Sequence, residues 1–247
     1  MTRPPAALLA IDAGNTRIKW GVHDGTAWSA IGAVATAESA SLADAWAGLP
    51  PVDAAIACNV AGASVERDLA AACTGRDITL LALASRAEQL GVVNGYRDPA
   101  ELGPDRWAAL LAAHVVGPGH KLVANAGTAL TVDVLAADGR FHGGIIVPGP
   151  ALMRASLSAG TARLARTEGA FAEFPASTPD AITSGALQAC VGAILRVRHA
   201  MMEHGMPPAH LLLSGGAAGD IAPLLPIPST IHENLVLDGL VRAARLP

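Results

Sequence analysis

Residues 8–22 read LLAIDAGNTRIKWGV and contain the first candidate site of the chain. A short apolar run ends in one carboxylate, Asp12, crosses a glycine and resumes as an extended segment, which predicts two antiparallel strands joined by a tight polar turn. Asp12 is suited to holding a hydrated divalent metal. The turn offers a glycine that an anion can approach, side-chain donors and a cation, as a phosphate-binding loop requires. These residues are Gly14, Asn15, Thr16 and Lys19.

A second copy of this pattern lies about half a chain further on. Residues 122–129 read LVANAGTA, again an apolar strand followed by a polar residue, Ala, Gly and a hydroxyl. An ordinary hairpin uses the same residue types, so one copy alone does not distinguish a turn from a phosphate site. Two copies predict a duplicated fold with a ligand held between its halves. The second turn contains Asn125, Gly127 and Thr128.

The composition predicts a compact globular protein that acts on a small molecule. The 247 residues are 51% hydrophobic and 15% charged, so the chain can bury a large core and has little capacity for disordered tails. The net charge is −4 and the basic residues are scattered, which argues against nucleic acid or a membrane as the main partner. A surface poor in charge is also compatible with a subunit interface.

The cysteines and the apolar runs predict a cytoplasmic protein. Cys58, Cys73 and Cys190 are odd in number and widely spaced, so neither a disulfide framework nor a zinc site is expected. Asp12 stops the first apolar run after six residues, and no segment reaches the roughly 18 apolar residues that a membrane helix needs.

The expected elements alternate as in an α/β fold. The first half reads βββαβαβ, and a Gly-Pro-Gly linker at 117–119 divides the chain into halves 1–117 and 118–247. The second half begins with another three-stranded meander. Beyond the two hairpins, strands are expected over 27–31, 53–60, 78–83, 140–147 and 211–217. Helices are expected over 41–46, 64–73, 105–116, 151–164 and 181–204, and from Asn234 to the end of the chain.

A polar segment over 94–106, NGYRDPAELGPDR, reads as a loop before a helix that Pro104 opens. Asp105 has two interpretations. It either offsets the positive end of that helix, worth about 0.3–1 kcal/mol, or acts as a general base for a kinase, with Arg106 binding a substrate carboxylate. Tyr96, the only tyrosine, either lines the pocket or is a buried structural residue.

Gly215 and Gly216 follow a buried strand near the C-terminus. Such a pair lets a planar ring or a sugar lie directly on the backbone, which suits an adenosine site. A simple tight turn is the alternative.

Seven motifs follow one another along the chain: DAGNTRIK at 12–19, GPDR at 103–106, NAGTA at 125–129, GGIIVPG at 143–149, STPDAITSG at 177–185, SGG at 214–216 and NLVLDG at 234–239. Together they resemble the type III pantothenate kinase family over essentially the whole chain. The resemblance implies the actin-like fold of the acetate and sugar kinases, in which two ribonuclease-H-like domains, each a mixed five-stranded sheet with flanking helices, enclose a ligand cleft. It also implies that ATP phosphorylates pantothenate to 4′-phosphopantothenate, the first step of coenzyme A synthesis, in a homodimer that needs Mg²⁺ and K⁺ or NH₄⁺.

The resemblance also assigns roles by position. It gives the phosphates and Mg²⁺ to residues 12–19, with Asp12 holding the metal through water, and brings Thr128 to ATP from the other half. Asp105 becomes the proton acceptor. The residues around pantothenate become Tyr96, Gly103, Pro104, Asp105, Arg106 and Thr178.

Two positions depart from the family pattern. Asn125 stands where Asp is common, at a position associated with the monovalent cation, so we expect weak or absent stimulation by K⁺. Ser177 stands where Asn is usual, which alters a helix cap and leaves Thr178 in place.

Two other functions remain open from the sequence. One is a kinase of the same fold that acts on another hydroxy acid or a sugar, and pantothenate should protect the 96–106 loop where a sugar should not. The other is a non-catalytic nucleotide-binding regulator, against which the retained Asp12, Asp105 and Arg106 argue.

Overall fold

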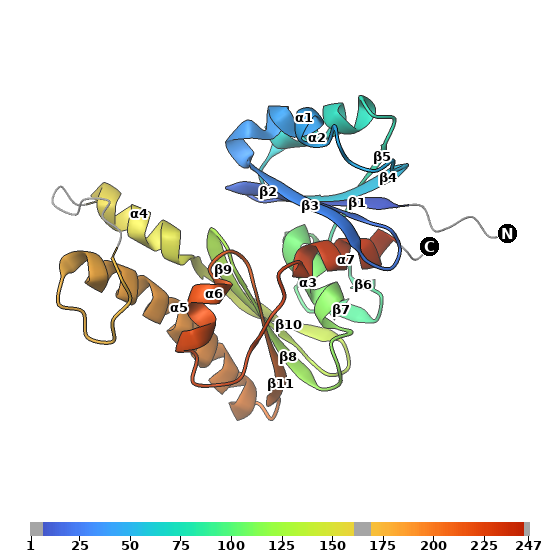
Figure 1. The fold of residues 1–247 in the computed structure, drawn as a ribbon. Helices are drawn as coiled ribbons and strands as arrows, with labels where there is room; N and C mark the ends of the chain where they lie inside the picture. Colours follow the sequence, from blue (N-terminus) through green and yellow to red (C-terminus); the bar gives the residue numbers. More distant parts are fainter. Residues whose placement is uncertain (1–6, 161–168, 245–247) are drawn as a thin grey trace. The chain divides into compact units, whose positions relative to one another are not determined.

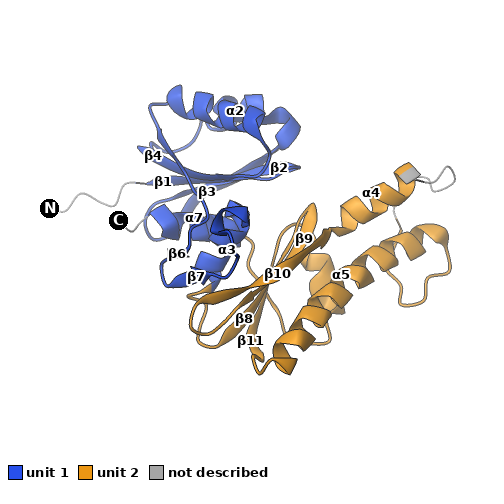
Figure 2. Ribbon diagram, turned by 180° about the vertical axis from the view of Figure 1, so that it is seen from behind, with its two compact units in different colours: residues 1–113, 234–247 blue, residues 114–233 orange. Residues whose placement is uncertain are grey.

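The computed structural model describes residues 7–160 and 169–244 and has an α/β fold (Figure 1). The chain forms two compact units (Figure 2). Unit 1 combines residues 1–113 with residues 234–247, and unit 2 comprises residues 114–233. In the described part of the chain, no helix is both long and apolar enough to cross a membrane.

The sheet of unit 1 has the strand order β3-β2-β1-β4-β5. The first three strands form an antiparallel meander, and β4 and β5 continue the sheet in parallel. This is the predicted βββαβαβ order. The strands are β1 (Leu8–Ala13), β2 (Arg17–His23), β3 (Trp28–Ala35), β4 (Ala54–Asn59) and β5 (Thr79–Ala82).

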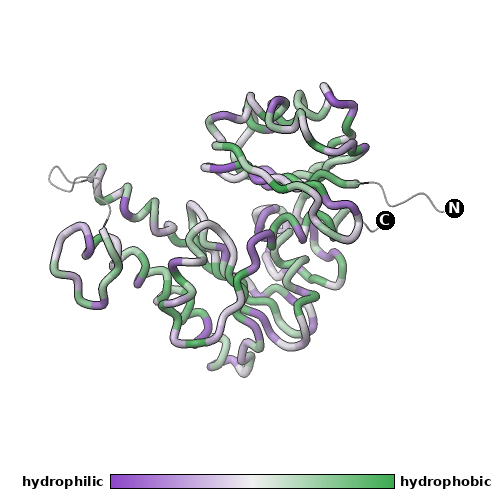
Figure 3. The backbone as a smooth tube through the Cα atoms, in the orientation of Figure 1, coloured by the Kyte–Doolittle hydropathy of each residue, from purple (hydrophilic) through white to green (hydrophobic). Residues whose placement is uncertain are grey.

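Helices cover both faces of this sheet (Figure 1). Alternate residues of β1, Leu9, Ile11 and Ala13, point toward α1 and α2 and are buried in the core between these helices and the sheet. The opposite face, which carries Asp12, packs against α3 and α7. Hydrophobic residues concentrate in the strands (Figure 3). The helices are η1 (Thr36–Ser41), α1 (Leu42–Ala45), α2 (Ala63–Thr74), α3 (Pro104–Ala113) and α7 (Leu235–Ala244).

A short hairpin that was not predicted lies just before the loop expected over residues 94–106. β6 (Glu88–Gln89) and β7 (Val92–Asn94) pair in antiparallel fashion, and η2 (Pro99–Glu101) follows. The turn needs positive φ at Leu90 (54°) and Gly91 (81°). A leucine is an unusual residue for that conformation, so the turn carried no recognisable sequence signal.

Unit 2 repeats the strand arrangement of unit 1. Its strands pair in the order β10-β9-β8-β11-β12, again as an antiparallel meander followed by parallel neighbours. The duplication inferred from the two hairpins is therefore present in the fold. The strands are β8 (His120–Ala126), β9 (Ala129–Leu135), β10 (Arg140–Pro148), β11 (Pro208–Ser214) and β12 (Thr230–Ile231).

The long helix α5 (Thr178–Glu203) buries Leu187, Cys190 and Ile194 against one face of this sheet. It begins with the predicted cap, because the Ser177 hydroxyl accepts a hydrogen bond from the Asp180 N–H at 3.3 Å. α4 (Pro150–Gly160) packs against α5, and α6 (Ala218–Ile221) and η3 (Ala222–Leu224) follow β11. The helix expected over 151–164 is seen as far as Gly160, and residues 161–164 lie outside the described residues.

The last helix, α7, belongs to unit 1 and not to the second half of the chain, where the predicted division at residue 117 put it. That division put α7 in the second half, whereas α7 packs against β1, β4 and α3 of unit 1. At Gly239 its backbone lies so close to the carbonyl of Ala108 on α3 that a Cβ would overlap it. An amphipathic pattern shows that a helix has an apolar face, but it does not identify the sheet that this face covers.

Candidate active site

The β1–β2 turn of unit 1 is closed by backbone hydrogen bonds and leaves its polar side chains exposed. The Gly14 N–H donates to the Arg17 carbonyl at 3.1 Å, and the Thr36 hydroxyl donates to the Gly14 carbonyl at 2.7 Å. Asn15 and Thr16 are exposed at the tip of the turn. This turn is therefore braced by the first residue of η1, while its tip can meet a ligand.

Asp12 lies in a polar group on the face of β1 that packs against α3 and α7. It pairs with Lys19 on β2 and with Cys58 on β4. The Cys58 Sγ donates to Asp12 Oδ1 at 3.4 Å, and this thiol is only 1% exposed. From the sequence, Cys58 was expected only to take part in neither a disulfide nor a zinc site, because its contact with Asp12 depends on the pairing of two strands far apart in the chain.

Burial and the nearby Asp105 carboxylate raise the pKa of Asp12 to about 6, against smaller opposing effects of the Cys58 hydrogen bond and the Lys19 charge. Burial, followed by the charges of Asp12 and Asp105, raises the pKa of the Cys58 thiol well above its ordinary value. Two carboxylates that repel each other in a partly dry site favour a cation between or beside them. The thiol, in contrast, stays protonated at neutral pH.

The start of α3 positions Asp105. Pro104 is the first residue of the helix, as predicted, and Asp105 follows it in the first turn. The carboxylate folds back over Gly103, where a Cβ would lie 2.6 Å from Asp105 Oδ1. Gly103 thus leaves room for this orientation of Asp105, whose carboxylate is close enough to Asp12 to influence its ionisation.

Arg106 and Tyr96 form a second pair in unit 1. Arg106 is only 4% exposed, its Nη1 donates to the Tyr96 hydroxyl at 2.9 Å, and its Cζ lies 5.6 Å from the centre of the tyrosine ring. Asn94 holds the tyrosine backbone, since its Oδ1 accepts from the Tyr96 N–H at 3.0 Å while its Nδ2 donates to the Pro99 carbonyl at 3.3 Å. Asn94 was not predicted, although the Asn-Gly pair at the end of a strand is a turn signal that could have identified it.

The second hairpin turn, in unit 2, has the same exposed character. Gly127 and Thr128 are exposed, and the Gly127 N–H donates to the Ala129 carbonyl at 2.9 Å. Gly149 approaches this turn closely, with its N–H donating to the Thr128 carbonyl at 2.8 Å. Asn125 pairs with Thr131 and with Ser214, so its strand neighbours are neutral and polar.

The two glycines after β11 have different roles. Gly215 has a φ of 90°, and a Cβ there would lie 2.5 Å from the backbone of Ala126, so the turn itself requires this glycine. A Cβ at Gly216 would meet no heavy atom of the described residues within 4 Å. Only Gly216 therefore leaves open backbone. Thr178, the first residue of α5, is exposed.

The predicted residues are thus divided between the two units. Unit 1 carries the first turn with Asp12, Lys19, Tyr96, Gly103, Pro104, Asp105 and Arg106, and it brings Asp105 near Asp12 and Arg106 onto Tyr96. Unit 2 carries Asn125, Gly127, Thr128, Thr178, Gly215 and Gly216. Among the residues that the structure describes, no three His, Cys, Asp or Glu side chains form a metal-binding group.

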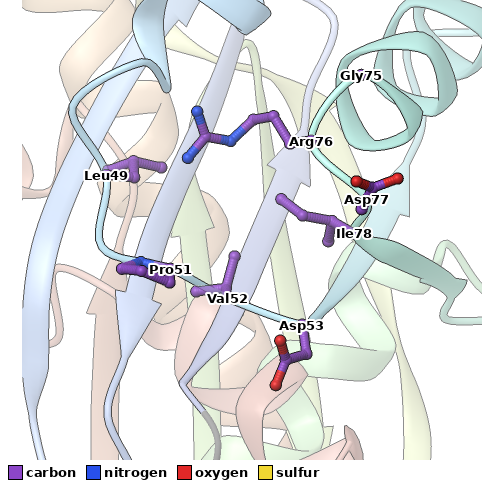
Figure 4. Close-up of a pocket in the computed structure, with 8 residues that line it drawn as sticks. All are labelled: Leu49, Pro51, Val52, Asp53, Gly75, Arg76, Asp77 and Ile78. Atoms are coloured by element: carbon purple, nitrogen blue, oxygen red, sulfur yellow. The ribbon is translucent and has the colours of Figure 1, made fainter.

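An open cavity of about 490 Å³ lies elsewhere in unit 1 (Figure 4). It lies beside the start of β4 and β5, whereas Asp12 and Cys58 lie toward the other end of the parallel strands. None of the predicted site residues lines it. Its lining residues are Leu49, Pro51, Val52, Asp53, Gly75, Arg76, Asp77 and Ile78.

Comparison with known proteins identifies the family. The model of the type III pantothenate kinase family matches residues 8–200. The chain belongs to the type III pantothenate kinase family. A type III pantothenate kinase from Aromatoleum aromaticum is 48% identical over 238 residues, covering 96% of this chain and 98% of the relative. Another from Dechloromonas aromatica is 41% identical over 233 residues, covering 94% of this chain and 97% of the relative.

Solved structures agree on the fold. A protein of Sinorhizobium meliloti, provisionally described as a 2-dehydro-3-deoxygalactonokinase, has a TM-score of 0.62 at 19% identity and covers 96% of each chain. An ethanolamine utilization protein of Carboxydothermus hydrogenoformans has a TM-score of 0.59 at 12% identity, covering 98% of this chain and 91% of its own. The predicted family, the actin-like fold and the enzyme class, a kinase that uses ATP and a divalent metal, are confirmed.

Proposed function

We propose that this chain transfers the γ-phosphate of ATP to the primary hydroxyl of pantothenate and so forms 4′-phosphopantothenate for coenzyme A synthesis. Beyond membership of the family, the observation that carries the proposal is the group formed in unit 1 by Asp12, Asp105 and the Arg106–Tyr96 pair. In this group Asp12 would hold a metal, Asp105 would accept a proton and Arg106 would bind the carboxylate of an acidic substrate.

The phosphates of ATP are bound by the two hairpin turns. Gly14, Asn15 and Thr16 offer backbone and hydroxyl or amide donors from unit 1, and Lys19 adds positive charge. Gly127 and Thr128 do the same from unit 2. Gly216 leaves open backbone for the adenosine, whereas Gly215 shapes the turn that presents it.

The site is suited to Mg²⁺. Asp12 and Asp105 bring two carboxylates together without full compensation, and Mg²⁺ prefers one or two carboxylates with phosphate oxygens and retained waters. Asp12 would hold the ion through water. The metal, when bound, neutralises charge on the phosphates.

Asp105 is the general base. As the pantothenate hydroxyl oxygen bonds to the γ-phosphorus and the bond to the ADP oxygen breaks, the hydroxyl proton passes to the Asp105 carboxylate. Gly103 leaves room for that carboxylate at the start of α3. Most of the acceleration then comes from positioning and charge neutralisation, because phosphoryl transfer needs little covalent help from the protein.

Arg106 binds the carboxylate of pantothenate, since a guanidinium has several donors in one plane and matches a carboxylate. The Tyr96 hydroxyl and ring hold the guanidinium in place. Gly103, Pro104 and the exposed Thr178 complete the substrate site. The burial of Arg106 supports this role, because a buried cation gains most from a charged ligand.

Asn125 weakens the case for a monovalent cation. Its amide and its strand neighbours Thr131 and Ser214 supply oxygen atoms but no charge. We therefore propose that K⁺ or NH₄⁺ stimulates this enzyme weakly or not at all.

A homodimer is supported by apolar side chains that unit 2 leaves exposed. They lie on β10, on α4 and in the segment before α5, and Phe174 is 88% exposed. A second copy of the chain is the occupant we propose for this surface. Its residues are Ile145, Ile146, Leu152, Leu157, Phe171 and Phe174.

An ADP-release assay tests the function. We expect ADP production that requires pantothenate and Mg²⁺, with little change on adding K⁺ or NH₄⁺. ADP release with a sugar but not with pantothenate would favour a related kinase, and no release with any acceptor would favour a nucleotide-binding regulator. Strict dependence on K⁺ would contradict the interpretation of Asn125.

A further inference from the structure

Cys58 is a buried thiol to which the mechanism above gives no role. It lies on β4 directly beside Asp12 in parallel register, and it is 1% exposed. Its Sγ donates to Asp12 Oδ1 at 3.4 Å, across 46 residues of sequence. The thiol therefore contacts the one carboxylate that the proposed mechanism places at the metal.

A donor at this position has a definite consequence for Asp12. The last torsion of an aspartate side chain is broad, so a carboxylate with few contacts samples many orientations. A hydrogen bond to Oδ1 restricts that torsion and leaves Oδ2 as the oxygen directed elsewhere. Outer partners of this kind commonly orient the groups that hold a metal.

The duplicated fold places a second pair of polar residues at the same strand positions. In unit 2, Ser214 on β11 lies beside Asn125 on β8 in the same parallel register that places Cys58 beside Asp12. Ser214 is also buried, at 4% exposure. In both units a small buried side chain with one polar hydrogen therefore lies beside the polar residue of the first strand. A purely apolar core would not need a polar hydrogen at this position.

Cys73 is a buried cysteine of unit 1 whose surroundings are apolar, which allows a comparison with Cys58. It is also 1% exposed in unit 1, but it lies on α2 in the apolar core with Val65 and Leu69. Only burial raises the pKa of its thiol, without a contribution from a carboxylate. Cys73 is thus the matched control for a thiol that acts by packing alone.

We propose that Cys58 is a positioning residue whose thiol, by donating to Oδ1 of Asp12, fixes the orientation of the carboxylate that would hold the metal. The inference rests on the proposed function, since it takes Asp12 as the residue that holds the metal. It adds a residue that acts through Asp12 and touches neither substrate nor metal.

The test measures how much Mg²⁺ strengthens binding of a non-hydrolysable β,γ-imido analogue of ATP, as the ratio of calorimetric Kd values without and with Mg²⁺. Cys58→Val keeps an apolar side chain of similar size and removes the donor, whereas Cys58→Ser keeps a donor. We expect Cys58→Val to lower the ratio about threefold to tenfold, the range for one hydrogen bond. Cys58→Ser should stay within about twofold of the wild type.

The controls separate this inference from the function on which it rests. Cys73→Val should leave the ratio unchanged, and Asp12→Asn should abolish most of the effect of Mg²⁺. If Asp12→Asn lowers the ratio but Cys58→Val does not, or if Cys58→Ser loses as much as Cys58→Val, the role of Cys58 is refuted and the proposed function stands. If Asp12→Asn also keeps the wild-type ratio, the metal assignment itself fails. Cys58→Ala replaces Cys58→Val if the valine variant does not fold.

Discussion

At the scale of single residues, the buried Asp12 carboxylate that we propose for the metal site also lowers the stability of the fold. Because its pKa in the folded protein is raised to about 6, the folded state binds its proton more tightly than the unfolded chain does. Ionised Asp12 therefore destabilises the fold above pH 6, and this cost disappears as the pH falls below the unfolded pKa of about 4. A site that binds a cation relieves the same cost, which is why a protein retains such a residue.

We predict that Asp12→Asn raises the free energy of unfolding by about 1–3 kcal/mol at pH 7.5 without metal, while abolishing turnover. The gain should shrink as the pH is lowered from 6 to 4, where the wild-type carboxyl is protonated. Urea denaturation of both proteins at pH 7.5 and pH 4.5 measures this. A stability difference that does not change with pH would contradict the raised pKa.

A second residue-scale prediction concerns Asp105. Replacing it with Asn keeps the shape of the side chain over Gly103 and removes the proton acceptor. We expect kcat to fall about 10²–10⁴-fold, the usual contribution of a general base, with affinity for the ATP analogue retained. Steady-state kinetics and calorimetry separate the two effects. Equal loss of nucleotide binding would show that Asp105 acts on the structure instead.

At the scale of elements, the α3–α7 pair holds the start of α3 in place. The two helices are in backbone contact where Gly239 meets Ala108, and the Arg242 side chain donates to the Leu111 carbonyl at 3.2 Å. α7 also packs on β1, which carries Asp12. The spacing between the two carboxylates of the site therefore depends on a helix whose own motif, NLVLDG, contains no residue of the site.

Gly239→Ala should consequently destabilise the protein by about 1–3 kcal/mol, because the added methyl group forces the two helices apart. Gly192 on α5 provides the control. A Cβ there meets nothing within 4 Å, so Gly192→Ala should stabilise by up to about 1 kcal/mol through helix propensity. Chemical denaturation distinguishes the two, and a Gly239→Ala variant as stable as the wild type would rule out the close contact.

At the scale of the whole molecule, the exposed apolar residues of unit 2 predict self-association. Analytical ultracentrifugation should show a dimer, and Ile146→Asp or Phe174→Asp should shift it toward monomer because a charge cannot be buried there without a partner. Leu81→Asp is the matched control, an apolar residue of unit 1 that is 49% exposed. A monomeric wild type, or equal weakening by Leu81→Asp, would argue against this surface.

Local patterns in the sequence were enough to find both hairpins, the opening of α3 at Pro104, the Ser177 cap and the family. These features depend on side-chain periodicity and on turn and cap chemistry among close neighbours, which the sequence records directly.

The tertiary structure alone decided three other features: the packing of α7 in unit 1, the hairpin that contains Leu90, and the contact of Cys58 with Asp12. Each depends on partners distant in sequence or on a conformation that the residue type disfavours. Strand register and helix docking follow from how the whole sheet buries its apolar faces, and no short segment of the chain carries that information.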